Sequence, residues 1–491
     1  MDLQLFRKIG DEIYFVYNPN ENVEVGDNFK IIDRNVNRGI LVQVIEVNLI
    51  DLPGILTDVL RREVSSSLVN LTEIKSKVME PLIDIRNMRI ARAKIRKEIL
   101  FENGVEVFSS WSGWTPSRAC RIEKVSPIEI ASKMNIGFKY EIEIGNPIND
   151  NNPIKINASD LQGINIIVGK KGSGKSHLAK IILLGIIRHG AKAIVFDIND
   201  EYSGLKYTEN GGESEYYDKI ITLEPNPTEN SEYVPLKFTL KYIGLNVIYR
   251  VLTEVLGLPE ASAYTFRNIW IDLERNDNLY LDLIYDMAED MSPKIAGAIT
   301  RRIETIESTG IITSNENECT RIEKLLERID NGGALIINLK AKGSPTQEIV
   351  VQTILSKIEE LLENEETEPL FIFAEEAHLY LERTVWINLV TRMRHLGAYQ
   401  FYMTNTPQSI DEIVIRQCDN IFIFNLTDKK DIWHIIPAAK IDEETISAIV
   451  KSLPPKQCLA IGIATREYPF IIETRGLPYI TAGKTKLLWE I

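Results

Sequence analysis

Long apolar runs and paired cysteines are both absent from this sequence of 491 residues. No apolar run reaches the ~18 residues that a membrane-spanning helix needs. The start, MDLQLFRKIGDE, lacks the cationic segment and apolar core of a secretory leader. The cysteines form no CxxC pair and have no neighbouring histidine, which predicts neither a zinc site nor a disulfide framework; they are Cys120, Cys319, Cys418 and Cys458. We therefore expect a reducing, cytoplasmic setting without membrane attachment.

An excess of positive charge is absent as well. The formal net charge is -14, which argues against a surface that coats nucleic acid, so any contact with DNA must be confined to a few loops. With 44% hydrophobic and 26% charged residues, the composition is that of an ordinary folded protein. The length allows two or three domains, each with its own core.

The first 150 residues have a β-like pattern. Short alternating apolar segments, including Val23 and Val25, run to about Val47 and predict a small β-barrel. A more helical stretch, 52–76, interrupts them, and extended segments resume around 83–99 and 138–144.

A basic stripe lies within the second group of extended segments. Arg92, Lys94 and Arg96 recur with period two, so they share one face of a strand. The stripe is either a solvated strand face or a contact with DNA or a partner.

Strand and helix patterns alternate from the linker 146–153 onward. This alternation is the signature of a parallel sheet with crossover helices, so a second domain is expected from 151 to 491, ending in a C-terminal tail. Between about 235 and 328 the sequence becomes helical, which predicts a helical insertion in which Ser292-Pro293 opens one helix. A later helix is expected to be capped by Ser344, with Pro345 in its first turn and Gln347 completing a capping box.

A phosphate-binding loop is the strongest signal. Residues 169–176 read GKKGSGKS, which satisfies GxxxxGK[ST] between a predicted strand, 164–168, and a predicted helix. The glycines let successive N–H groups point inward at phosphate oxygens, and the helix N-terminus adds positive potential. Lys175 should reach the β- and γ-phosphates and Ser176 should ligate Mg²⁺. The expected nucleotide-binding set is Gly169, Gly172, Ser173, Gly174, Lys175, Ser176 and His177.

Two adjacent acids follow the apolar strand 370–374. Open α/β sheets place their ligands at the carboxyl ends of strands, so this is the position of a Walker B segment. Glu375 is expected to orient Mg²⁺, directly or through water, and Glu376 to act as general base on the attacking water. Asp197, with Glu201, either holds water or senses nucleotide, or merely caps the end of its strand.

Four segments together resemble the HerA branch of the HerA/FtsK superfamily of P-loop ATPases: IIVGKKGSGKS, VFDINDEY, LFIFAEEAHLYL and RMRHLGAYQFYMTNTPQSIDEIVIRQCDNIFIF. The resemblance implies an α/β, RecA-like ATPase core with a helical insertion, preceded by a barrel similar to the HAS-barrel. By motif position, Arg394 is implied as the arginine finger that reaches a neighbouring subunit's γ-phosphate, with Arg392 in reserve. Thr404 and Asn405 are implied as the polar sensor, although many relatives read S/T-Q-R-P where this chain has TNTP.

The function implied by the resemblance is an ATP-dependent, DNA-translocating helicase. It would use ATP and Mg²⁺, form a homohexameric ring around double-stranded DNA, and work with a NurA-type nuclease in end resection. Such a motor contacts phosphates without reading bases; Lys340, Lys342 and Arg383 lie on candidate pore segments. Two alternatives stay open, a conjugation- or secretion-type ATPase and a nucleotide-dependent ring scaffold that recruits an effector nuclease, for example in antiviral defence.

Overall fold

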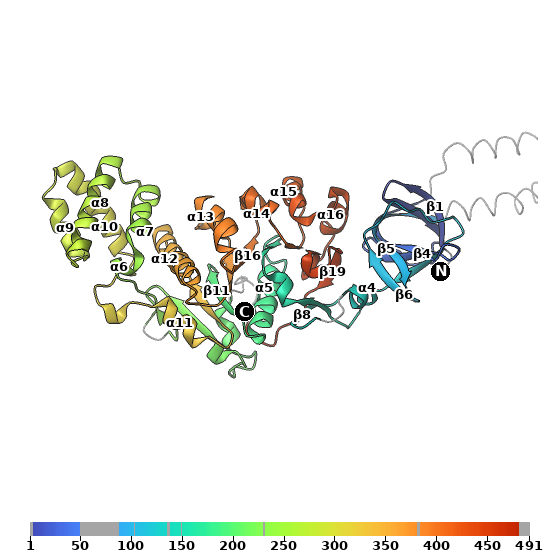
Figure 1. Cartoon of the computed structure of the whole chain (residues 1–491), viewed down its shortest axis with the longest axis horizontal. Helices are drawn as coiled ribbons and strands as arrows, with labels where there is room; N and C mark the ends of the chain where they lie inside the picture. The colour runs from blue at the N-terminus through green and yellow to red at the C-terminus, as the bar shows by residue number, and fades with distance from the viewer. Residues whose placement is uncertain are drawn as a thin grey trace, which may run out of the picture.

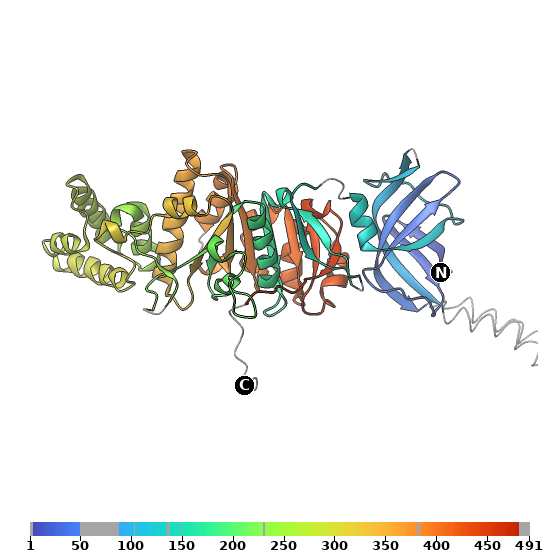
Figure 2. The ribbon, with the colours of Figure 1, turned by 90° about the horizontal axis from the view of Figure 1, so that it is seen from below.

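The computed structural model describes residues 3–49, 88–102, 104–134, 138–148, 150–228, 231–380 and 383–480. The molecule is elongated, with a curled N-terminal sheet at one end, a large central sheet in the middle and a helical insertion at the other end (Figures 1 and 2). Within these residues, none of the helices combines the length and the apolar character needed to cross a membrane.

The N-terminal domain is a curled antiparallel sheet with the strand order β1-β2-β5-β4-β3-β7, to which β6 adds by pairing with β5. Its strands are β1 (Leu3–Ile9), β2 (Glu12–Tyr17), β3 (Asn28–Asp33), β4 (Arg38–Leu49), β5 (Arg89–Glu102), β6 (Val105–Ser109) and β7 (Arg121–Val125). Alternating side chains such as Phe15 and Phe29, whose rings lie 5.0 Å apart, fill its core. The predicted strand at Val23 and Val25 is wrong, because these residues lie in the turn before β3. The predicted helical stretch 52–76 lies outside the described residues.

The basic stripe lies on β5 and faces the rest of the chain. The side chains of Lys94 and Arg96 are only 9% and 8% exposed, so the interpretation as a solvated strand face is wrong. Arg92 and Arg96 instead bind acidic and hydroxyl groups of α16 (Glu443–Val450) and of the turn before it. The period-two spacing did place the three cations on one face.

A short antiparallel hairpin connects the two domains. Its strands are β8 (Glu141–Gly145) and β9 (Ile154–Asn157), preceded by the helix α4 (Pro127–Met134). The apolar side chains of Ile142 and Ile156 pack into the same core as α5 of the central domain. The expected domain boundary at 150 therefore falls in the turn of this hairpin.

The central domain is built on a ten-stranded sheet with the order β13-β12-β14-β11-β15-β16-β10-β17-β18-β19. The strands from β13 to β17 in this order are parallel, and β18 and β19 add antiparallel at one edge. These antiparallel strands lie in the segment expected to be a tail. The strands are β10 (Ile164–Val168), β11 (Lys192–Asp197), β12 (Ile220–Glu224), β13 (Val234–Pro235), β14 (Gly333–Asn338), β15 (Leu370–Glu375), β16 (Ala398–Thr404), β17 (Asn420–Ile423), β18 (Gln457–Gly462) and β19 (Phe470–Glu473).

Helices cover both faces of this sheet. One face packs against α5 (Lys175–Arg188) and the β8–β9 hairpin. The other packs against α12 (Ser344–Glu363), α14 (Glu412–Arg416), α15 (Lys429–Ala439) and α16, which with α13 (Arg383–Asn388) form a row in Figure 1. Burial on both faces explains the continuous apolar runs of the central strands.

The segment in which a helical insertion is predicted, about 235–328, is largely helical. Its helices are α6 (Leu240–Ile243), α7 (Leu245–Arg250), α8 (Glu260–Arg275), α9 (Leu281–Glu289), α10 (Pro293–Glu307) and α11 (Ile322–Arg328). As predicted, α10 has Ser292 at its N-cap and Pro293 in its first turn. The capping box predicted for α12 is wrong: Gly343 is the N-cap, and no side chain caps the helix. Because the helix starts one residue early, the Ser344 hydroxyl cannot take the capping position.

Candidate nucleotide-binding and hydrolysis site

The phosphate loop connects β10 to α5 and is held by the backbone of a neighbouring segment. Gly169 and Gly174 have positive φ angles of 152° and 117°, which favour glycine. A Cβ on Gly169 would lie 2.5 Å from the Cβ of Phe424, so the loop packs directly against Phe424. The amide of Lys170 donates to the carbonyl of Asn425 at 3.0 Å, and the amide of Lys456 donates to the carbonyl of Ser173 at 2.8 Å.

Lys175 begins α5 and folds back over the loop. Its Nζ donates to the carbonyls of Gly169 at 2.9 Å and Lys170 at 3.0 Å. Burial lowers the pKa of the Lys175 ammonium, while the nearby Glu376 and Glu375 carboxylates act in the opposite direction. The cation thus lies between the main chain of the loop and the two acids.

A pocket of about 710 Å³ opens at this loop. Its lining contains most of the residues predicted to bind nucleotide and Mg²⁺, together with residues that were predicted for other roles. Its lining includes Gly172, Gly174, Lys175, Ser176, His177, Lys180, Glu201, Lys340, Glu375, Glu376, His378 and Asn405. Gly169 and Ser173 lie in the loop beneath it, and the buried Ser173 hydroxyl has no hydrogen-bond partner among the described residues.

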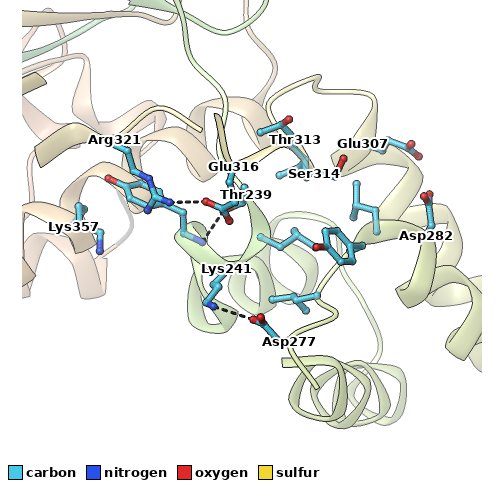
Figure 3. Close-up of a pocket in the computed structure, with 16 residues that line it drawn as sticks. Thr239, Lys241, Asp277, Asp282, Glu307, Thr313, Ser314, Glu316, Arg321 and Lys357 are labelled. Atoms are coloured by element: carbon cyan, nitrogen blue, oxygen red, sulfur yellow. Dashed lines mark hydrogen bonds and ion pairs between the residues drawn. The ribbon is translucent and has the colours of Figure 1, made fainter. Parts of the chain in front are cut away.

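A larger hollow of about 950 Å³ lies at the helical insertion, with Lys357 of α12 also in its lining (Figure 3). Its cations are neutralised by neighbouring acids: Lys241 pairs with Asp277 at 3.0 Å and Arg321 with Glu316 at 2.6 Å. This hollow lacks a glycine-rich loop with inward amides. The smaller pocket at the phosphate loop is therefore the better phosphate site.

Glu375 ends β15 as a buried carboxylate. Burial raises the pKa of Glu375 well above its ordinary value, and Asp197 and Glu201 raise it further, whereas the Ser176 hydroxyl and the Lys180 ammonium lower it. Its Oε2 is buried without a hydrogen-bond partner among the described residues. Such a carboxylate needs a cation or a proton.

The residues around Glu375 fit a Mg²⁺ ion. Within the described residues, no group of three or more His, Cys, Asp or Glu side chains could hold a metal by itself. Mg²⁺ in nucleotide sites is usually held by one or two protein groups together with phosphate oxygens and water. The free oxygen of Glu375 and the hydroxyl of Ser176 are a donor set of that kind.

Glu376 follows directly and points into the same pocket. Its backbone has a φ of 44°, in the left-handed region, and its amide donates to the carbonyl of Met403 at 2.7 Å. Its carboxylate accepts a hydrogen bond of 2.7 Å from the Thr404 hydroxyl and one of 3.2 Å from the Asn405 amide. The two residues predicted as a polar sensor therefore hold the predicted general base.

Asp197, which is buried, and Glu201, which is half-buried, belong to the same acidic cluster as Glu375. The Asp197 carboxylate accepts from the amides of Asn199, Glu201 and Tyr202, so it does cap the end of its strand. Burial raises the pKa of Asp197 to about 6. Glu201 lies 3.6 Å from Lys180, which is buried in α5. Nucleotide sensing by Asp197 stays a prediction.

The predicted arginine finger, Arg394, does not line the nucleotide pocket. Arg394 donates to the Asp419 carboxylate at 2.7 Å, and the same carboxylate accepts from the amide of Ile164. Ile164 begins β10, so Arg394 lies about 15 Å from the phosphate loop, at the opposite end of that strand. It does not serve the pocket of its own chain. The reserve residue, Arg392, pairs with Glu359 and Glu363.

The candidate pore cations are also engaged within the chain. Lys340 lines the nucleotide pocket and lies 3.6 Å from Asp200, and Lys342 lies 3.1 Å from Glu224. The side chain of Arg383 lies outside the described ones. A role of these residues in a pore stays a prediction.

Sequence reasoning missed three residues around the site. Lys180 and His378 line the pocket, and Asn425 holds the loop from beneath. A lysine inside the apolar run of α5 was a visible signal for Lys180, because such a position is buried. No sequence signal points to Asn425, since its contacts come from segments far apart in the chain.

Comparison with known proteins agrees with this geometry. Residues 142–358 match the family described as Helicase HerA, central domain. Two relatives are both named DNA double-strand break repair helicase HerA. The one from Saccharolobus solfataricus is 22% identical over 343 residues, covering 66% of this chain and 66% of the relative. The one from Sulfolobus acidocaldarius is 20% identical over 369 residues, covering 69% of this chain and 70% of the relative. The match thus spans about two thirds of the relatives' length.

Solved structures show a similar fold over 70–74% of this chain. The bacterial conjugative coupling protein TrwBΔN70 superposes with a TM-score of 0.52 at 13% identity, covering 74% of this chain and 94% of that chain. VirB4 of Thermoanaerobacter pseudethanolicus superposes with a TM-score of 0.50 at 14% identity, covering 70% of this chain and 98% of that chain. TrwB has also been solved with an ATP analogue and with ADP and Mg²⁺. The chain has an α/β P-loop ATPase fold, and its predicted resemblance to HerA-type ATPases of the HerA/FtsK kind is confirmed.

Proposed function

We propose that this chain hydrolyses ATP and uses the energy to move double-stranded DNA through a homohexameric ring. The observation that carries the hydrolytic part is the held carboxylate of Glu376. It faces the pocket of a phosphate loop, and both of its oxygens accept hydrogen bonds, from Thr404 and from the Asn405 amide. A carboxylate fixed at this place can orient a water and take its proton.

Each part of the pocket has a separate task in this mechanism. The loop amides and Lys175 bind the phosphates and offset their charge. Ser176 and Glu375 would hold Mg²⁺, which neutralises charge that develops on the phosphate oxygens when it is bound. Glu376 accepts the proton of the attacking water. Arg394 would act on the nucleotide of a neighbouring subunit, because it lies away from the pocket of its own chain.

Translocation on DNA is supported by the relatives, whose names state a DNA repair helicase. The net charge of -14 means that contacts with phosphates would be confined to a few loops inside the ring. The curled N-terminal sheet corresponds in this proposal to a HAS-barrel, and a NurA-like nuclease in DNA end processing is the proposed partner. Affinity for DNA would then fall steeply with salt.

A conjugation- or secretion-type ATPase is the second candidate. The likeness of this chain to TrwB and VirB4 favours it, although that likeness concerns the fold. The two candidates differ in what stimulates hydrolysis, which is duplex DNA for a HerA-like motor and single strands or protein for the other. Nucleotide-driven ring formation without stimulation by DNA would instead indicate the scaffold for an effector nuclease.

The test is ATP turnover with and without linear duplex DNA. We expect duplex DNA to raise kcat and Glu376→Gln to lower it by about a hundredfold or more, since a general base contributes at least that much. Glu412→Gln, in an exposed pair with Arg416 on α14, is the matched control and should leave turnover unchanged. The mass of the assembly in solution with Mg²⁺-ATP tests the hexamer. Full turnover in Glu376→Gln would contradict the proposal.

A further inference from the structure

Asn425 connects the phosphate loop to the end of α16. It lies two residues after the end of β17, and its carbonyl accepts the amide of Lys170 at 3.0 Å. Its side-chain amide donates to the carbonyls of Val450 at 3.3 Å, Lys451 at 3.1 Å and Leu453 at 3.1 Å. One residue therefore bonds both the second residue of the loop and the turn that ends the helix.

The segment that follows α16 makes a second bond to the loop. The amide of Lys456 donates to the carbonyl of Ser173 at 2.8 Å. The carbonyl of Lys456 in turn accepts the amide of Thr474 at 2.9 Å, beyond the end of β19. The phosphate loop is thus attached to the segment that begins with α16 directly at Ser173 and, through Asn425, at Lys170.

The other end of α16 is bound by the N-terminal domain. Asp442 is the N-cap of the helix and accepts from the amide and the hydroxyl of Thr445. Arg96 of β5 donates to the Thr445 hydroxyl at 2.8 Å and lies 3.6 Å from the Asp442 carboxylate. Its side chain is nearly buried, so it binds the cap without competition from water.

Additional contacts fix the N-terminal domain on this same region. Glu444 in the first turn of α16 lies 3.1 Å from Arg92 and 3.9 Å from Lys94. Gln43 of β4 donates to the carbonyl of Pro469 at 3.0 Å, and the Tyr468 hydroxyl donates to Asn28 of β3 at 2.6 Å. The domain therefore binds α16 and the turn before β19.

We propose that Asn425 is a positioning residue for the phosphate loop and that the N-terminal domain, by holding the cap of α16 through Arg96, sets the nucleotide affinity of the central domain. A helix of two turns is stiff, so a displacement of its capped start moves the turn bonded to Asn425. This inference rests on the proposed function only in requiring that the loop binds nucleotide. It predicts that a contact in the N-terminal domain changes a binding constant at a site in another domain.

The first variant is Asn425→Asp in the full chain, which keeps the size of the side chain and removes its donors. We expect the Kd for Mg²⁺-ADP, measured by titration calorimetry, to rise about five- to twentyfold. At saturating ATP, kcat should change less than KM, because the catalytic carboxylate keeps its contacts. Asn364→Asp is the matched control, since Asn364 is an exposed residue at the end of α12.

The second variant is Arg96→Met, which removes the cation at the cap. The Kd should rise about three- to tenfold, a usual size for coupling between sites. Arg96→Lys should restore part of the affinity. Arg121→Met on β7, where the arginine is exposed and pairs with Glu123, should leave the Kd unchanged. Adding Arg96→Met to Asn425→Asp should have little further effect, since both act on the same connection.

Melting curves and circular dichroism establish that each variant is folded. Should Arg96→Met fail to fold, Glu444→Gln weakens the neighbouring contact between α16 and Arg92 of β5, from an exposed position in the first turn of the helix. Wild-type protein that binds no Mg²⁺-ADP would overturn the proposed function itself. Wild-type protein that binds it, together with folded Arg96 or Glu444 variants and a folded Asn425→Asp that bind it equally well, would overturn this inference alone.

Discussion

The Thr404 hydroxyl donates a 2.7 Å hydrogen bond to the carboxylate of Glu376, across the boundary between β16 and β15. The amide of Asn405 donates to the other oxygen of this carboxylate at 3.2 Å. With both oxygens occupied, the Glu376 side chain has one preferred orientation toward the pocket. The polar residues at the carboxyl end of β16 therefore act on the base itself.

Thr404→Val should lower kcat for ATP by about tenfold while KM changes little. The substitution keeps the shape of the side chain and removes one hydrogen bond to a charged group, a loss of roughly 1.5 kcal/mol or more. Steady-state ATP turnover measures both constants. Thr391→Val, at an exposed threonine in the helical turn that follows α13, is the control. A raised KM with unchanged kcat would instead place Thr404 in substrate binding.

Gly169→Ala should raise the Kd for nucleotide by about tenfold or more. The new Cβ would lie 2.5 Å from the Cβ of Phe424, so the loop must shift in addition to bearing the cost of a positive φ, about 1–2 kcal/mol. Gly190→Ala is the matched control. Gly190 also has a positive φ, of 87°, but a Cβ there meets no atom within 4 Å. It should lower the melting temperature without changing nucleotide binding.

Asp197 should make the protein less stable as the pH rises from about 4 to about 6. Because burial raises the pKa of Asp197 to about 6, the folded state retains a proton that the unfolded state has already lost. This contribution to stability is complete below the unfolded pKa, falls through that window and is constant above it, with a size on the order of 1–3 kcal/mol.

Asp197→Asn provides the comparison for this prediction. Thermal melts of both proteins in EDTA, without nucleotide, give the difference in stability at each pH, and groups that do not interact with Asp197 cancel. The wild type should lose stability relative to the variant between pH 4 and 6. A difference that grows in favour of the wild type over this range would contradict the assignment.

Arg394 should act in trans if it is the arginine finger. Arg394→Ala and Glu376→Gln proteins are each expected to hydrolyse ATP poorly, and mixing them should restore part of the turnover. In mixed rings some interfaces combine an intact Glu376 with an intact Arg394 from the neighbouring subunit. If the pair with Asp419 only stabilises the fold, Arg394→Ala should match Asp419→Asn in lowering the melting temperature while retaining turnover.

The sequence predicted those parts of the site that are local in the chain. The phosphate loop and Glu375–Glu376 each follow an apolar strand, and parallel strands present their carboxyl ends at one edge, so their meeting could be foreseen. The stripe of Arg92, Lys94 and Arg96 was correctly placed on one face. Its partner, α16, lies some 350 residues away in the chain, and no local pattern encodes that contact.

The wrong cap of α12 and the unpredicted strands β18 and β19 have similar physical causes. The cap of α12 was misplaced by one residue, because Gly343 and Ser344 both suit the start of a helix and only the backbone conformation decides. The strands β18 and β19 were not predicted, although Cys458 and Leu459 are buried, since a short apolar run near the end of a chain fits several structures.

The hairpin of β8 and β9 determines where the central domain can be separated by proteolysis or truncation. The side chain of Ile142 lies so close to α5 that a Cβ on Gly185 would be 2.7 Å from it. Asn146 exchanges two backbone hydrogen bonds with Glu473 of β19. A cut at residue 150 would uncover this apolar surface of α5 and leave the edge of β19 open to pairing with other molecules. A fragment starting near residue 138 should stay monodisperse, whereas one starting at 151 should aggregate.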